Sequence, residues 1–144
     1  MRFADVDRAG ILYYPRFLNY FHIAFEEFFG RSIGVPYADL IERDRLAFPM
    51  VHLEVDFKVP LAFGDHALVL VRPTRVGRTS VDFTYEVTSR KKGVLCSSAK
   101  ATTVAVNIDT FAPLPVPEPY RGLLLARVGG GAVTPPRPPS EHLS

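Results

Sequence analysis

The chain has 144 residues, of which 47% are hydrophobic and 22% are charged, and this is the size and composition of one soluble globular domain. The formal net charge of +2 is too small to favour a nucleic-acid partner. The single cysteine, Cys96, excludes an intramolecular disulfide framework. Because the sequence shows neither a long apolar run nor a signal peptide, we expect a cytoplasmic protein without a membrane partner.

The first predicted element is a helix over residues 15–29. Pro15 suits the first helical position, and Gly30 is a natural stop. Apolar side chains cover most of its circumference and leave only a narrow polar stripe. The stripe consists of Arg16, Asn19, His22 and Glu26. A helix of this kind has to be covered by other parts of the protein.

Residues 31–45 are expected to form a loop, after which the hydrophobic period changes from helical to two. The alternation predicts a half-buried strand over residues 51–59. Further strands are expected over 67–76, 79–89 and 94–108, joined by short Gly-containing turns. The last three would form an antiparallel meander.

Beyond Asp109 four prolines interrupt any regular ladder. Residues 120–128 could form a short docking helix, and 129–144 are expected to be a flexible tail rich in Gly and Pro. The chain therefore reads as one domain over residues 1–128. A sheet with one apolar face and a helix that is apolar on most sides are expected to cover each other. Apolar surface left on such a sheet favours a homodimer at least.

The segment before the helix offers the clearest chemistry. Asp7 would lie in a tight loop that leads into the N-terminus of the helix, where backbone N–H groups are free and partially positive. Such groups can stabilise an oxyanion, and a nearby carboxylate can attack a thioester carbonyl or deprotonate a water. The run from Asp7 to Gly10 also fits an ordinary type I turn, and the residues alone favour that simpler interpretation.

Residues 3–17, Phe-Ala-Asp-Val-Asp-Arg-Ala-Gly-Ile-Leu-Tyr-Tyr-Pro-Arg-Phe, resemble the signature of the 4-hydroxybenzoyl-CoA thioesterase family. The resemblance covers roughly residues 1–120. It implies an α+β hotdog fold, in which a curved antiparallel β-sheet is wrapped around one long central helix. It also implies a homodimer or homotetramer that hydrolyses acyl-CoA or acyl-carrier-protein thioesters without a metal, with no cofactor beyond the coenzyme A of the substrate.

Position by position, the resemblance implies that Asp7 is the catalytic carboxylate, acting as nucleophile or general base. The backbone N–H of Tyr14 would face the thioester carbonyl, and Gly10 would allow close approach of the substrate. Asp5 would support the loop. Family members usually carry an opening strand ahead of this signature, whereas here only residues 1–4 precede it. We therefore expect a very short first strand or a start codon further upstream.

Six residues are candidates for substrate binding. Tyr13 and Phe17 would contact the substrate. An apolar acyl pocket is suggested by Phe17, Tyr20, Phe21 and Phe25, although core packing explains these four equally well. His22 could reach the cleft or could hydrogen-bond within a packed interface. The turn residues Arg78, Arg90 and Lys91 could pair with coenzyme A phosphates, or could simply be solvated.

Several kinds of chemistry find no support. The His, Cys, Asp and Glu residues show no metal-ligand spacing, so we expect no metal. Cys96 is expected in the core, and His52 and His66 on the surface. An acyl-CoA thioesterase is the leading hypothesis; a carrier-protein thioesterase and a non-catalytic acyl-thioester binding module remain as alternatives. The identity of the acyl group cannot be read from the sequence.

Overall fold

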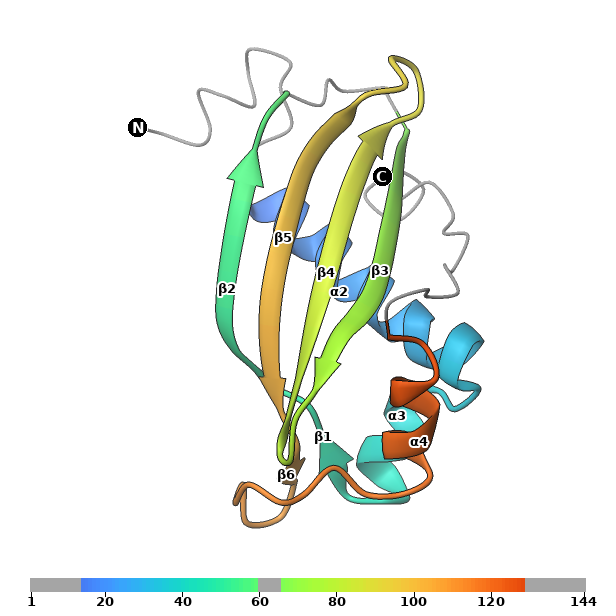
Figure 1. Ribbon diagram of the computed structural model, residues 1–144, viewed down its shortest axis with the longest axis vertical. Coiled ribbons are helices and arrows are strands. Elements are labelled where there is room, and N and C mark those ends of the chain that lie inside the picture. The colour runs from blue at the N-terminus through green and yellow to red at the C-terminus, as the bar shows by residue number, and fades with distance from the viewer. Residues whose placement is uncertain (1–13, 60–65, 129–144) are drawn as a thin grey trace.

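The computed structural model describes residues 14–59 and 66–128, with side chains from Asn19 onward. A long helix crosses one face of a curved four-stranded sheet, and short helices gather at one end (Figure 1). The helical segments are α2 (Tyr14–Phe28), the π-helical turn η1 (Phe29–Ile33), α3 (Tyr37–Glu42) and α4 (Tyr120–Leu125). The strands are β1 (Leu46–Ala47), β2 (Met50–Phe57), β3 (Ala67–Val76), β4 (Ser80–Ser89), β5 (Leu95–Val104) and β6 (Val106–Asn107).

The main sheet has the order β2-β5-β4-β3, and every neighbouring pair is antiparallel. The predicted meander of three long strands is therefore confirmed as β3, β4 and β5. The predicted fourth strand divides into β5 and β6 at Ala105, because β6 leaves the main sheet and pairs with β1. Strand β2 lies at the edge beside β5, and in the described part of the chain its other edge has no strand partner.

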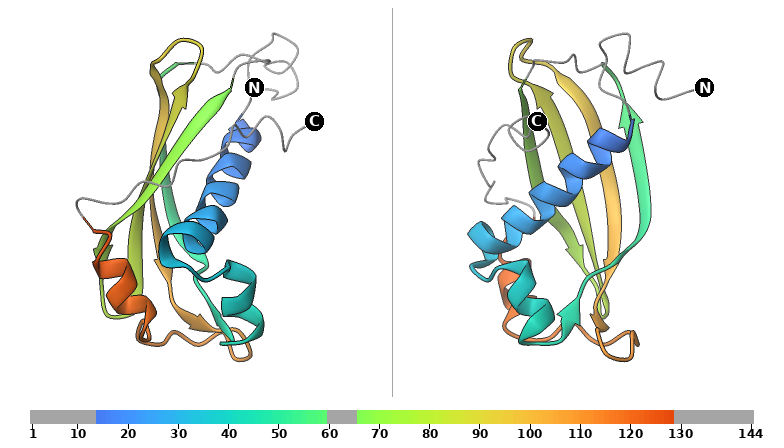
Figure 2. Two further views of the ribbon diagram at one scale, coloured as in Figure 1. Left: turned by 90° about the vertical axis from the view of Figure 1, so that its right-hand side faces the viewer. Right: turned by 180° about the vertical axis from the view of Figure 1, so that it is seen from behind.

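Helix α2 is buried on the side that faces the sheet, as its apolar circumference predicts. Tyr20, Phe21, Phe25 and Phe28 are at most 7% exposed, and Asn19, His22 and Glu26 form an exposed polar stripe. The contact with the sheet is largely aromatic. The ring of Phe25 meets that of Phe83 on β4 edge to face, with centroids 5.2 Å apart. Figure 2 shows the helix lying diagonally across this single face.

The end of the helix differs from the prediction. Gly30 does not stop it; the chain continues through η1 and ends at Gly34, whose φ of 88° lies in the left-handed region. The N–H groups of Gly34 and Val35 both donate to the carbonyl of Phe29 and close the terminus. The extension buries Phe29 and Ile33 against the core. Burial of these two apolar side chains accounts for the additional turn.

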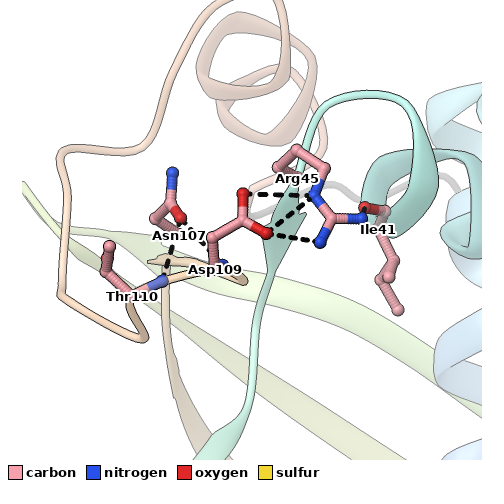
Figure 3. A network of polar contacts seen from close by, with 5 residues as sticks. All are labelled: Ile41, Arg45, Asn107, Asp109 and Thr110. Atoms are coloured by element: carbon pink, nitrogen blue, oxygen red, sulfur yellow. Dashed lines mark hydrogen bonds and ion pairs between the residues drawn. The ribbon is translucent and has the colours of Figure 1, made fainter.

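The predicted loop over residues 31–45 was wrong in part, because it contains α3. The ion pair between Arg45 and Asp109 fixes the end of this segment: Nη2 of Arg45 lies 2.5 Å from Oδ1 of Asp109 (Figure 3). Arg45 has a φ of 53°, which is uncommon for a residue other than glycine. Its carbonyl also accepts the N–H of Ile108. These contacts join the entry of β1 to the exit of β6.

Helix α4 confirms the predicted docking segment, although it ends at Leu125. Tyr120 and Leu124 are buried, and the Tyr120 hydroxyl donates to the Asp44 carboxylate. Nη2 of Arg127 donates to the carbonyl of Ser32 at 2.6 Å, which links this end to η1. Cys96 is fully buried, as expected for a small core residue. None of the described helices is long and apolar enough to cross a membrane.

Candidate active site

The N-terminus of α2 is the first part of the candidate site. The helix begins at Tyr14, so the backbone N–H of Tyr14 belongs to the first turn, where N–H groups have no partner within the helix. This position agrees with the role that the resemblance implies. Asp7, Gly10 and Tyr13 lie outside the described residues, as does the side chain of Phe17, and their roles stay predictions.

The second part is an apolar cavity of about 330 Å³ between α2, the strands and the segment that carries Phe48. Its lining residues come from parts of the sequence that lie far apart. They are Phe21, His22, Phe25, Tyr37, Phe48, Pro49, Met50, Leu53, Tyr85 and Thr103. Five of these side chains are aromatic. A concave, aromatic-lined space with few polar groups is typical of a small-molecule site.

Three lining residues carry hydroxyl groups, and two of these are already hydrogen-bonded. Thr103 Oγ1 donates to the carbonyl of Val81 at 2.9 Å, and Tyr37 Oη accepts the N–H of Phe48 at 2.8 Å. Tyr85 is fully buried, and among the residues that the structure describes its hydroxyl has no hydrogen-bond partner. Burial raises the pKa of Tyr85 above its usual value, so the group is a neutral phenol that can donate and accept.

His22 is one of the predicted residues that the structure places at this cavity. It comes from the exposed stripe of α2, and its Nε2 lies 3.1 Å from Oε2 of Glu26, one helical turn further on. Both side chains are at least half exposed. Met50, the first residue of β2, is also exposed and lines the cavity. The cavity therefore opens beside His22 and the start of β2.

The structure does not bring the predicted basic residues together. Arg90 and Lys91 lie in the turn between β4 and β5, and Arg78 lies in the turn between β3 and β4. These turns are at opposite ends of the long strands, and α2 begins nearer the β4–β5 turn (Figures 1 and 2). Within one protomer the ten residues of β4 separate Arg78 from Arg90 and Lys91, and the pairing of these residues with coenzyme A phosphates stays a prediction.

Other predicted surface residues are found where they were expected. His52 is exposed and its Nε2 lies 2.9 Å from Oε2 of Glu54, which lowers the pKa of the Glu54 carboxyl. His66 is also exposed. Over residues 14–59 and 66–128, the structure contains no group of three or more His, Cys, Asp or Glu side chains that could hold a metal ion.

Sequence reasoning missed Tyr85, Tyr37 and Phe48 as site residues. Tyr85 lies on the inward face of β4, where buried and half-buried residues alternate, but alternation does not reveal which hydroxyl lacks a partner. Tyr37 is the first residue of the short helix that the predicted loop concealed, and Phe48 follows β1. The only signals in that segment were Pro36 before the helix and Asp39 in its first turn.

Comparison with known proteins agrees with this architecture. Residues 1–124 match the Thioesterase-like superfamily. The 1,4-dihydroxy-2-naphthoyl-CoA hydrolase of Nostoc punctiforme is 38% identical over 109 residues, which cover 76% of this chain and 70% of the relative.

Solved structures agree as well. A thioesterase superfamily protein from Jannaschia sp. CCS1 superposes with a TM-score of 0.77 at 26% identity, over 89% of this chain and 88% of the other. A 1,4-dihydroxy-2-naphthoyl-CoA thioesterase from Synechocystis gives a TM-score of 0.74 at 26% identity, over 85% of this chain and 88% of the other.

The fold and these similarities together define a hotdog-fold hydrolase of thioesters. The chain belongs to the Thioesterase-like superfamily, and the expected α+β hotdog fold is confirmed. The narrower assignment to the 4-hydroxybenzoyl-CoA thioesterases stays a prediction, since the relatives named above carry a different acyl group in their names.

Proposed function

We propose that this protein hydrolyses an aromatic acyl-CoA of the 1,4-dihydroxy-2-naphthoyl-CoA type to a carboxylic acid and free coenzyme A. The observation that carries the proposal is the aromatic-lined cavity beside α2, the helix whose first turn contains the end of the thioesterase signature. The names of the relatives support the aromatic acyl group. No cofactor is needed beyond the coenzyme A of the substrate.

The proposed chemistry uses few groups. The thioester carbonyl would accept hydrogen bonds from the N-terminus of α2, including the backbone N–H of Tyr14, and these bonds would stabilise the oxyanion. Asp7 would either attack the carbonyl carbon or remove a proton from an attacking water. In both routes the C–S bond breaks, and the electron pair leaves with the coenzyme A thiolate. In the nucleophilic route water would then hydrolyse the anhydride between the acyl group and Asp7, which releases the acid and regenerates the carboxylate.

The cavity distinguishes an aromatic acyl group from a short aliphatic one. Phe21 lies seven residues after Tyr14, which is about 10 Å along a helix axis. Side chains on a helix lean toward its N-terminus, so the ring of Phe21 covers the turn closer to the proposed oxyanion site. A flat two-ring acyl group held at the helix end would extend into the cavity, whereas an acetyl group would not reach it.

Thiol release from a panel of acyl-CoAs tests this proposal. We expect kcat/KM for 1,4-dihydroxy-2-naphthoyl-CoA to exceed that for acetyl-CoA and palmitoyl-CoA by at least about tenfold. Equal rates for all three would contradict the aromatic assignment. Hydrolysis only of acyl groups linked to a carrier protein would favour the second enzymatic hypothesis. Tight binding of acyl-CoA with no thiol release would favour the binding module.

We propose in addition that the protein forms a homodimer or homotetramer. Strand β2 is the edge of the sheet, and it exposes Met50 (42%) and Val51 (60%). An edge strand with exposed apolar side chains is a template for pairing with another chain. A second copy of this chain satisfies that edge in the same antiparallel manner that joins β2 to β5.

A further inference from the structure

Three arginines gather at the turn between β3 and β4, at the end of the sheet away from the start of α2 (Figures 1 and 2). Arg78 lies in the turn itself and is exposed. The guanidinium of Arg75 lies at Gly77, where its Nη1 would be 3.4 Å from an added Cβ. Arg121 comes from α4, and its Nη1 donates to the carbonyl of Gly77 at 2.8 Å. The arginine cluster of Arg75, Arg78 and Arg121 therefore joins β3, the turn and α4.

The charges of the arginine cluster are not neutralised within the protein. Over residues 14–59 and 66–128, none of the three forms an ion pair with a carboxylate. Asp82 is opposite Arg75 in the register of β3 and β4, but no ion pair joins the two side chains. Glu118 precedes Arg121 on the chain, and its Oε1 instead accepts the N–H of Gly122 at 3.1 Å.

Two arginines elsewhere in the fold show the contrast. Arg43 is paired with Asp44 at 3.0 Å, and Arg45 is paired with Asp109. Each of these guanidinium groups has its counter-charge inside the protein. In the arginine cluster the positive charges repel one another, and an anion bound between them would relieve this repulsion.

The backbone of the turn holds the arginine cluster in a defined arrangement. The N–H of Gly77 donates to the carbonyl of Ser80 at 2.7 Å, which closes the turn. Gly77 has no side chain, and an added Cβ would lie 2.9 Å from Oγ of Ser80 as well as close to Arg75. The absence of that Cβ leaves space beside the Arg75 guanidinium. The hydrogen bond from Arg121 to the same glycine brings a second guanidinium to this space.

The charge and geometry of the donors indicate the chemistry of the ligand. Guanidinium groups bind phosphate oxygens through paired hydrogen bonds, and a phosphate ester carries up to two negative charges near pH 7. We infer that Arg75, Arg78 and Arg121 form a binding site for phosphate groups. Their source is either the nucleotide end of coenzyme A or free pyrophosphate. The inference adds Arg75 and Arg121 to the predicted role of Arg78, and it requires no hydrolysis of a thioester.

Titration calorimetry on the full chain tests this site with coenzyme A, inorganic pyrophosphate and pantetheine, which contains no phosphate. We expect Arg75→Gln and Arg121→Gln each to raise the Kd of the phosphate ligand by about tenfold. Lys100→Gln is the matched control, since it removes an exposed positive charge on β5, and its Kd should stay within about twofold of wild type.

The three ligands distinguish the sources of the phosphate. Binding of coenzyme A without binding of pyrophosphate would support the nucleotide end as the ligand, and binding of both would support a general phosphate site. Pantetheine should not compete with either. The inference would be overturned if the wild type bound neither phosphate ligand, or if Lys100→Gln weakened binding as much as the arginine variants.

A second variant separates ligand binding from the structural bond between Arg121 and the turn. Ser80→Asp keeps all three arginines and places a carboxylate near Arg75, where it would occupy the position proposed for the phosphate. We expect at least about a tenfold rise in Kd in this variant, with its unfolding midpoint no lower than that of wild type. Saturating phosphate ligand should raise the midpoint of wild type but not that of Ser80→Asp. Unchanged affinity in folded Ser80→Asp would contradict the site.

Discussion

Tyr85 on β4 and Phe21 on α2 pack their rings together at a centroid distance of 5.0 Å across the boundary between sheet and helix. The contact joins the two layers of the fold and also forms part of the cavity wall. The hydroxyl of Tyr85 contributes nothing to this packing, because within the described residues it has no hydrogen-bond partner. The same residue therefore contributes to the core through its ring, while its hydroxyl is buried without a partner in the described part of the chain.

The first prediction concerns stability. Tyr85→Phe should leave the free energy of unfolding unchanged or raise it, because it removes a buried hydroxyl that has no partner. Tyr37→Phe is the matched control, since it removes the acceptor of the Phe48 N–H. We expect it to lower the free energy of unfolding by about 1 kcal/mol. Urea denaturation measures the free energy of unfolding of both variants. A larger loss for Tyr85→Phe than for Tyr37→Phe would show that the Tyr85 hydroxyl has a stabilising partner.

The second prediction concerns the end of α2. Gly34 has a φ of 88°, whereas Gly30 has no positive φ and an added Cβ there would meet nothing within 4 Å. Gly34→Ala should therefore destabilise the protein by about 1 kcal/mol. Gly30→Ala should be neutral or stabilise it by about 0.5 kcal/mol. Thermal unfolding of both variants measures this difference in stability. A greater loss of stability in Gly30→Ala than in Gly34→Ala would place the end of the helix at Gly30.

The third prediction concerns the stability of the fold at acidic pH. The hydrogen bond from Arg45 lowers the pKa of Asp109, so the ionised carboxylate stabilises the fold above the ordinary pKa of about 4. This stabilisation is lost as the pH falls through the lower pKa of the folded state. Asp109→Asn should lower the midpoint of thermal unfolding at pH 7 and reduce its further decrease between pH 5 and pH 2.

The salt dependence of the same variant provides the control. Both side chains of the pair are about half exposed, so 1 M NaCl should weaken the pair and reduce the difference between wild type and Asp109→Asn at pH 7. Parallel pH profiles of the two proteins between pH 5 and pH 2 would show that Asp109 has no part in the acid response.

The fourth prediction concerns assembly. Val51→Lys places a charge on the exposed end of the β2 edge and should shift the protein toward smaller species in sedimentation velocity. Phe111→Lys changes an equally exposed apolar residue, 61% against 60%, in the loop after β6 and should not alter the distribution. A wild type that sediments as a monomer at all concentrations would contradict the proposed assembly.

The long elements of this fold could be predicted from residue patterns because each has a repeated signal. The alternation of β3 and β4 and the nearly continuous apolar surface of α2 are local properties, and burial in the structure follows them. The end of α2 could not be predicted, since the π-helical turn depends on burying Phe29 and Ile33 against distant residues. Helix α3, at six residues, is too short to show a period.

The candidate site could be predicted only in part. The resemblance implied roles for Asp7, Gly10 and Tyr14 because they belong to a continuous signature next to a helix start, and these roles stay predictions. The cavity was not found, because its walls come from residues 21 to 103, and its shape depends on how side chains from five separate segments fit together. Tyr85 lies on the inward face of β4, but the lack of a partner for its hydroxyl among the described residues is a tertiary property.

The most direct test of the central claim is thiol release from 1,4-dihydroxy-2-naphthoyl-CoA by wild type, Asp7→Asn and Asp5→Asn. Asp5 is the matched control, because it is a carboxylate of the same segment to which we assign no chemistry. We expect kcat to fall by about 10²-fold or more in Asp7→Asn and by less than about threefold in Asp5→Asn, with both variants folded. Undiminished turnover in folded Asp7→Asn would contradict the account.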